Sequence, residues 1–259
     1  MIKKIVKKRY HALKKYYELY KLGKKFSNDE SFQLTKNLTN IEKTKKPYRF
    51  DIINFLSLTI NAQNYLEIGV RNPADNFNLI NISNKYSVDP GVEFELNPVD
   101  FKMTSDDFFS QLSQNSLKIP NDTKFDVIFI DGLHLAQQVE KDIFNSIQYL
   151  SEDGFIVLHD CNPPSEHHAR ETYSFYNSPA GGAWNGTTWK AFVKARMTYN
   201  SCCIDSDWGV GIISKSAKPG LNILKNSEEN HFYEYSIFND KRKEFLNLLS
   251  FESFTQKNS

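Results

Sequence analysis

Two strongly apolar runs with a helical pattern between them constrain the fold of this chain most. The runs are FDVIFIDG at 125–132 and GFIVLHD at 154–160. Strands that are apolar throughout are typical of parallel sheets covered by helices on both faces. The segment 134–150 between them has the apolar spacing of an amphipathic helix. The pattern therefore predicts a strand–helix–strand unit with parallel strands.

The same alternation continues on both sides of this unit. Expected helices cover 49–63, 75–83, 104–113 and 188–196, and expected strands cover 64–70, 85–91, 200–206 and 209–216. Only a short turn at Asp207–Trp208 separates the last two strands, so we expect them to form an antiparallel hairpin at one edge. The predicted fold is α/β: a Rossmann-like, doubly wound, mostly parallel sheet closed by that hairpin, in one domain of residues 47–259.

Residues 1–46 are predicted to form a basic helical extension. Residues 1–25 carry ten Lys or Arg and one acid, a net charge of +9, so the rest of a chain of net charge +1 carries −8. Apolar and tyrosine side chains recur at helical spacing: Ile2, Ile5, Val6, Tyr10, Leu13, Tyr16, Tyr17 and Tyr20. Such a helix packs on its own domain as a lid, joins two copies in a homo-oligomer, or lies on an anionic membrane. Nucleic acid is not an expected partner, since no recognition motif follows.

The apolar runs and the cysteines indicate in which cellular compartment to expect this protein. No apolar run reaches the ~18–20 residues that span a bilayer, and we expect no secretory signal. The cysteines, Cys161, Cys202 and Cys203, are odd in number and two are adjacent, which favours a reducing compartment over a disulfide framework. Their spacing does not predict structural zinc. We expect a cytoplasmic protein, at the inner membrane face if the basic helix binds lipid.

Acids and histidines lie at the carboxyl ends of four of the predicted strands. They are Glu67 before Gly69, Asp89, Asp131 with Gly132 and His134, and His159 with Asp160. Singly, each is also explained as a turn residue, a strand exit or a buried histidine. Ligands bind at the carboxyl ends of strands in an open α/β sheet, and charge gathered at one rim is costly unless it is used or paired. The set therefore predicts a functional site at this edge.

The turn after the first strand bears on the cofactor. A nicotinamide dinucleotide favours GxGxxG here to seat its pyrophosphate, whereas this turn reads GVRNPA. S-adenosylmethionine has no phosphate and makes no such demand. Asp89 can accept hydrogen bonds from the ribose hydroxyls of either cofactor. The turn therefore favours S-adenosylmethionine over a dinucleotide.

The motifs YLEIGV, YSVDPG, KFDVIFIDGLH and GFIVLHDCNPP resemble, in this order, those of class I S-adenosylmethionine-dependent methyltransferases. Within that superfamily residues 50–215 look most like the macrocin-type sugar O-methyltransferases of glycan and natural-product biosynthesis. The resemblance implies that Asp131 and Asp160 hold a divalent cation such as Mg²⁺ and that His134 is the base. Cys161 departs from the pattern, because an Asn or Asp ligand is usual there and a thiolate suits Mg²⁺ poorly; Asn162, His159 or water is the alternative ligand. The cofactor contacts expected are Glu67, Gly69, Val70, Arg71, Asn72, Asp89, Pro90, Ser105, Asp131, Gly132 and His134.

The segment 163–196 is the expected acceptor side, since rim loops commonly carry specificity. Candidate acceptor contacts are His159, Glu166, His167, His168, Trp184 and Trp189, with a helix core position as the alternative for Trp189. The predicted function is methyl transfer from S-adenosylmethionine to a hydroxyl of a saccharide or glycosylated small molecule. The alternatives are a nicotinamide-dependent oxidoreductase and a non-catalytic cofactor-binding module that docks through the basic helix.

Overall fold

A computed structural model describes residues 2–93, 97–173, 178–225 and 234–258, and the side chains from residue 7 onward within these ranges. Its strands form one mixed sheet in the order β2-β1-β3-β4-β6-β5-β7. Strands β1 (Asn64–Ile68), β2 (Asn84–Val88), β3 (Phe125–Ile130) and β4 (Leu150–Leu158) are mutually parallel where they pair. This confirms the Rossmann-like, mostly parallel sheet.

The expected antiparallel hairpin is also present. It consists of β5 (Asn200–Ile204) and β6 (Val210–Ser214), and β6 runs antiparallel to β4. The hairpin does not form the edge of the sheet, because the two-residue strand β7 (Leu248–Leu249) pairs with β5 on its outer side.

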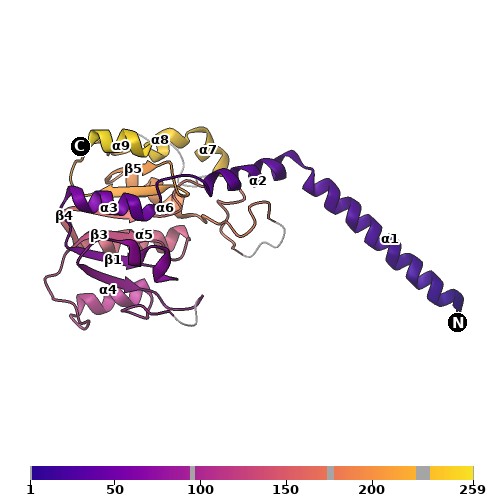
Figure 1. Ribbon diagram of the computed structural model, residues 1–259, viewed down its shortest axis with the longest axis horizontal. Coiled ribbons are helices and arrows are strands. Elements are labelled where there is room, and N and C mark those ends of the chain that lie inside the picture. Colours follow the sequence, from indigo (N-terminus) through magenta and orange to yellow (C-terminus); the bar gives the residue numbers. More distant parts are fainter. Residues whose placement is uncertain (1, 94–96, 174–177, 226–233, 259) are drawn as a thin grey trace.

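Helices cover both faces of the sheet and bury a core on each. One core includes residues of α4 (Ser105–Ser113), α5 (Ala136–Tyr149), α6 (Thr188–Arg196), α7 (Tyr235–Asp240) and α8 (Arg242–Leu246). The other includes residues of α3 (Arg49–Thr59) and α9 (Phe251–Lys257). Thr104 caps α4 by accepting a hydrogen bond from the Asp107 amide at 3.1 Å. The order of these elements matches the doubly wound arrangement expected (Figure 1).

The helix expected over 75–83 is wrong. The chain instead makes two short 3₁₀ turns, η1 (Pro73–Asp75) and η2 (Phe77–Leu79). Asn76 between them has φ −149°, outside the helical range, and its side chain turns inward to donate to Glu67. A side-chain bond to the strand below therefore replaces helical continuity.

The N-terminal extension is two helices, α1 (Ile2–Ser27) and α2 (Glu30–Glu42). Asp29 caps α2 by accepting hydrogen bonds from the Ser31 and Phe32 amides. Figure 1 shows α1 projecting away from the sheet while α2 leads back to it. The extension is thus largely helical, as expected, and α2 buries Thr35, Thr39 and Glu42. The boundary at 46/47 stays a prediction.

Candidate active site

The sheet order places the ends of β1, β3 and β4 side by side. Asp131 directly follows β3, His134 lies in the loop before α5, and His159 and Asp160 follow β4. One ligand atom from each of Asp131, His134 and Asp160 lies within 4.8 Å of the other two. The structure thus brings together the three residues expected to carry the chemistry.

His134 sits between the two carboxylates. Its Nε2 is 3.3 Å from Asp131 Oδ1 and its Nδ1 is 3.1 Å from Asp160 Oδ2. Burial opposes the charged imidazole, but Asp160 and Asp131 outweigh it and raise the pKa of His134 to about 9. This pKa lies well above the ordinary histidine value of about 6.5. Without a bound cation, His134 is therefore an imidazolium near neutral pH.

The acceptor loop holds His134 from the other side. The Thr187 amide donates to the His134 carbonyl at 2.8 Å, and the Trp184 ring stacks on the imidazole at 5.2 Å between centroids. Gly186 has φ 60°, and a Cβ there would lie 2.1 Å from the same carbonyl. Only glycine fits this conformation and this approach. The segment 184–187 therefore fixes the position of His134.

His159 links the two acids of the cluster to a third, Asp207, on the more buried side of the site. Its Nδ1 lies 3.2 Å from Asp131 Oδ1 and 3.4 Å from Asp160 Oδ2, and its Nε2 lies 3.5 Å from Asp207 Oδ1. Burial works against protonation, yet Asp131 and Asp160 raise the pKa of His159 well above its usual value. The side chains of His159 and Asp160 are 9% exposed, whereas those of Asp131 and His134 are 19% and 20% exposed. Asp131 and His134 are therefore the more solvent-exposed residues of the cluster, and His159 and Asp160 are the more buried ones.

Besides Asp207, two residues absent from the predicted site complete this network. Arg49 at the start of α3 donates from its amide and guanidinium to Asp207 Oδ2, at 2.8 and 3.2 Å, and its Nε is 3.8 Å from Asp131. Burial would raise the pKa of Asp207, but His159 and Arg49 lower it to about 2. Asn185 donates to Asp160 Oδ1 at 2.9 Å. Nothing in the pattern around Arg49 or Asn185 marks them as site residues, because only the tertiary fold brings them here.

The hairpin turn that carries Asp207 packs against the exit of β4. Asp207, Trp208 and Gly209 all have positive φ, and the Cys161 and Asn162 amides donate to the Gly209 and Trp208 carbonyls at 2.9 Å. The Cys161 side chain belongs to the core and burial raises the pKa of its thiol, so it is no cation ligand. Asn162 is engaged by Asp205 and Arg242 instead. Of the alternative side chains, His159 is the one that contacts both Asp131 and Asp160.

A cation fits this donor set. With both imidazoles neutral, the Asp131, Asp160 and Asp207 carboxylates and one guanidinium would carry a net charge of −2. Carboxylate oxygens suit Mg²⁺ or Mn²⁺. Asp131 and Asp160 are the residues that would hold it, and His134 lies within reach of both.

The predicted cofactor side is arranged around the first turn. Gly69 has φ 90°, and a Cβ there would lie 2.4 Å from the Asp131 carbonyl oxygen and from Gly132 Cα. This glycine is thus required by the close approach of β1 and β3, whether or not a cofactor binds. Asp89 Oδ1 accepts from the Gly91 amide at 2.6 Å and from Asn97 at 2.9 Å, and Asn97 also donates to the Val70 carbonyl. Asp89 Oδ2 has no hydrogen bond to the described residues and can accept a ribose hydroxyl.

Glu67 lies below this turn, not in it. It is 3% exposed and accepts from Tyr65 Oη at 2.6 Å and Asn76 Nδ2 at 2.8 Å. Burial raises the pKa of Glu67 to about 7, against the effect of these two bonds. Glu67 is placed to support the turn from beneath.

The other predicted cofactor residues are spread over the surrounding loops. Arg71 is exposed and pairs with Asp75 at 3.6 Å, Asn72 caps η1, and Val70 is buried. Ser105 accepts from Gln138 at 3.2 Å where α4 meets α5, and Pro90 lies in the loop after β2. Cofactor contact by these residues stays a prediction.

The predicted acceptor residues divide into rim and core. Trp184 is beside His134, and Glu166 is exposed. His167 is partly buried, and its carbonyl accepts from Arg170. Trp189 is 1% exposed and packs on Phe238 at 4.3 Å between ring centroids, so the core alternative holds and it cannot face an acceptor. His168 is fully buried, bonded to Thr39 of α2 at 3.1 Å and to Ser165 at 2.8 Å, and burial lowers its pKa to about 4. His168 therefore joins α2 to the acceptor loop and does not line an open site.

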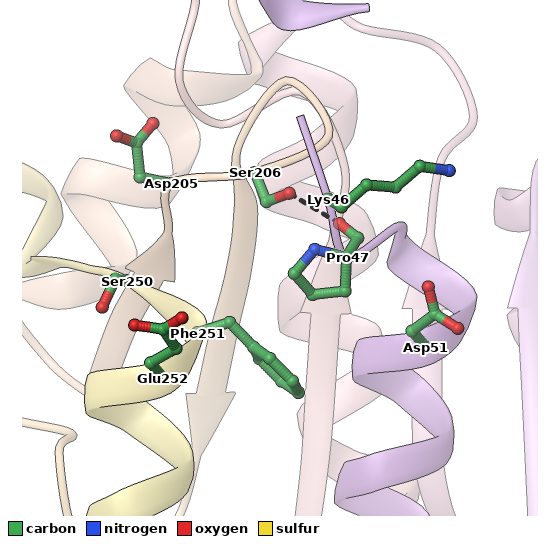
Figure 2. A pocket seen from close by; sticks show the side chains of 8 residues that line it. All are labelled: Lys46, Pro47, Asp51, Asp205, Ser206, Ser250, Phe251 and Glu252. Atoms are coloured by element: carbon green, nitrogen blue, oxygen red, sulfur yellow. Dashed lines mark hydrogen bonds between the residues drawn. The ribbon is translucent and has the colours of Figure 1, made fainter. Parts of the chain in front are cut away.

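A separate pocket of about 550 Å³ lies beside the start of α3 (Figure 2). Ser206 donates to the Pro47 carbonyl across it at 2.6 Å, and Phe251 lies near Pro47. Its lining residues are Lys46, Pro47, Asp51, Asp205, Ser206, Ser250, Phe251 and Glu252. None of the predicted site residues is among them, so this pocket is not the site derived above.

Among curated proteins, no sequence matches this chain. Similar solved structures include an O-methyltransferase from Bacillus cereus in complex with SAH, at 15% identity and a TM-score of 0.38, covering 73% of this chain and 92% of that one. The O-methyltransferase TomG from Streptomyces achromogenes, in complex with SAM, has 10% identity and a TM-score of 0.39, covering 74% and 94%. MycE from the mycinamycin biosynthetic pathway, in complex with Mg, SAH and mycinamycin VI, has 12% identity and a TM-score of 0.39, covering 76% and 57%.

A family model described as a methyltransferase domain matches residues 75–161, which include β2, β3, β4 and the cluster of Asp131, His134 and Asp160. The match does not separate sugar acceptors from others. It covers about a third of the chain, holds the predicted site and supports the predicted methyltransferase activity.

Proposed function

We propose that this protein transfers the methyl group of S-adenosylmethionine to a hydroxyl oxygen of a saccharide or glycosylated small molecule, with the help of a divalent cation. The observation that carries the proposal is the cluster of Asp131, His134 and Asp160 at the carboxyl edge of the sheet. It lies within the segment that matches a methyltransferase domain. Two acids and a histidine at this edge suit deprotonation of an acceptor hydroxyl.

The reaction asks for alignment and for removal of one proton. Bound by Asp131 and Asp160, a cation would lower the pKa of the acceptor hydroxyl. His134, held by Trp184 and Thr187, receives the hydroxyl proton on a ring nitrogen. Arg49 and Asp207 hold His159 and Asp131 in place from behind.

The cofactor side is proposed from the turn after β1 and the end of β2. Asp89 Oδ2 accepts a ribose hydroxyl, and Gly69 and Gly132 leave backbone without side chains where β1 and β3 meet. The same turn disfavours a dinucleotide, because it lacks the glycines that seat a pyrophosphate.

A sugar acceptor is proposed from the motif resemblance and from the aromatic rings beside His134. Trp184 stacks on His134, and Tyr173, which is 62% exposed, meets the Trp184 ring edge-on at 5.4 Å. Aromatic faces at a rim are surfaces on which sugar rings can pack. Tyr173 adds to the acceptor contacts expected from the sequence.

Labelled S-adenosylmethionine, incubated with the purified protein and a panel of nucleotide sugars and glycans, tests this function. We expect methylation of a member of the panel that a chelator abolishes and Mg²⁺ or Mn²⁺ restores. Full turnover in excess chelator would remove the cation from the proposal and leave Asp131 and Asp160 as orienting groups. Calorimetry that shows binding of NAD and not of S-adenosylmethionine would support the oxidoreductase alternative. Cofactor binding without turnover on any acceptor would support a non-catalytic module.

A further inference from the structure

Helix α1 stands apart from the rest of the protein. It projects from α2 as a single long helix, and α2 is the element that returns to the body (Figure 1). Between residues 7 and 25 it carries eight Lys or Arg and one acid, Glu18, which pairs with Lys21 at 3.7 Å. Because α1 projects away from the sheet, its charged surface is available to a partner.

One face of α1 is a stripe of large side chains in water. Tyr10, Leu13, Tyr17 and Tyr20 are spaced by three and four residues, so they lie on one side of the helix. They are 64%, 68%, 57% and 66% exposed. Lys7, Lys14 and Lys21, spaced by seven, form a row directly alongside the stripe. This combination of an apolar and aromatic face with basic flanks is typical of helices that lie in a membrane interface.

A second copy of the chain is a poorer occupant of the stripe. In a coiled coil with Tyr10 and Tyr17 at a and Leu13 and Tyr20 at d, Lys14 and Lys21 occupy e positions. Arg9 occupies a g position, so a parallel partner would bring like charges together across the seam. An anionic surface meets the same side chains with the opposite sign.

We propose that α1 binds an anionic lipid bilayer, lying in the plane of the surface with its tyrosine stripe toward the lipid. The rest of the chain carries −8, so attraction to anionic lipid resides in this arm and not in the body. None of the described helices is long and apolar enough to cross a membrane, so α1 binds at the surface. This proposal goes beyond methyl transfer and does not depend on it.

Sedimentation of the full-length protein with vesicles tests the proposal. Vesicles of phosphatidylcholine with about one-third phosphatidylserine should bind it at least ~10-fold more strongly than phosphatidylcholine alone, and added salt should weaken binding. Tyr10→Gln with Tyr17→Gln should reduce binding by about 10-fold or more, because it removes the interfacial aromatic face. The matched control, Leu19→Gln with Leu22→Gln, removes two exposed apolar side chains from the opposite side of α1 and should bind as the wild type does.

The mass of each free protein, measured by light scattering, separates the lipid from a second copy. We expect the same mass for wild type and both variants. Absence of vesicle binding, or equal loss of binding in the stripe variant and its control, overturns the proposal. A wild-type dimer that becomes a monomer in the stripe variant, without vesicle binding, assigns the stripe to self-association instead. Unchanged S-adenosylmethionine affinity in the variants shows that they are folded, so a failure here is distinct from a failure of the proposed function.

Discussion

The charges of helix α1 and the charges at the carboxyl edge of the sheet are placed in opposite ways. In α1, lysines and tyrosines face water, and the ion pair described there, Lys21 with Glu18, joins side chains more than half exposed. At the sheet edge, Arg49, His134, His159 and three aspartates lie within ion-pair distance of one another and are mostly buried. An exposed pair contributes little, whereas removing one member of a buried network leaves an uncompensated charge.

This contrast predicts where a substitution is felt. A change at the sheet edge should alter chemistry or folding, because every group there touches another. A change on α1 should alter membrane binding and leave the domain of residues 47–259 unchanged.

The largest effect is expected for His134→Ala. If His134 takes the hydroxyl proton, kcat should fall about 10²–10⁴-fold while cofactor affinity changes little. Because the neutral imidazole is the active form, the wild-type rate should rise with pH through the pKa of His134, which is about 9 without a cation and lower with one. Steady-state kinetics with the true acceptor measure both. His11→Ala on α1 is the control and should keep the wild-type rate.

His134 has a second role open to it, as a cation ligand, and a metal titration distinguishes the two. As a base, its loss lowers kcat at an unchanged half-saturating Mg²⁺ concentration. As a ligand, its loss raises that concentration, and high Mg²⁺ restores part of the rate. A His134→Ala enzyme with near wild-type kcat would refute the base assignment and direct attention to His159 or His167.

The next effect in size is expected for Asp89→Ala. Charge-assisted bonds to ribose hydroxyls are worth ~1.5–3 kcal/mol each, so affinity for S-adenosylmethionine should fall on the order of 10²-fold. Asp153→Ala is the control, since Asp153 is exposed, pairs with Lys218 and lies near the start of β4, away from the carboxyl edge of the sheet. Calorimetry measures both. An unchanged affinity in Asp89→Ala would mean that this carboxylate serves the loop alone, through Gly91 and Asn97.

The sequence predicts the parts of this site that lie on strands and misses those that arrive from elsewhere. Asp131, His134 and Asp160 were identified because apolar runs fix the strands, and parallel strands end at one edge. Arg49, Asn185 and Asp207 contact them from α3, the acceptor loop and the hairpin turn, and no periodicity reports such contacts. The error over 75–83 has a similar cause, because Asn76 turns inward to Glu67 and apolar spacing alone cannot show this. Trp189 shows the limit for single residues, since a buried and a rim tryptophan look alike in sequence.

A smaller effect is expected from Glu67→Gln, on stability. The pKa of Glu67 is about 7 in the folded protein and near 4.5 when unfolded, so the folded state holds its proton over a higher pH range. The free energy of unfolding should therefore decrease as pH rises from 4.5 to 7, by on the order of 2 kcal/mol, and then level off. Glutamine cannot ionise, so the variant should lose this part of the pH dependence. Urea unfolding at several pH values measures it, and equal slopes in both proteins would show that Glu67 ionises normally.

The smallest effect is expected from deleting residues 1–27. The side chains of α1 described from residue 7 onward are nearly all exposed, and its end meets α2 through the Phe26–Phe32 ring contact and a hydrogen bond from Gln33 to the Ser27 carbonyl. Helix α2 stays, with Thr39 still bonded to His168, so the acceptor loop keeps its support. The free energy of unfolding should change by less than about 1 kcal/mol, and S-adenosylmethionine affinity should be unchanged. Thermal unfolding and calorimetry on the truncated protein measure these quantities. A large loss of either would show that α1 supports the body, and the contrast between arm and sheet edge would then be wrong.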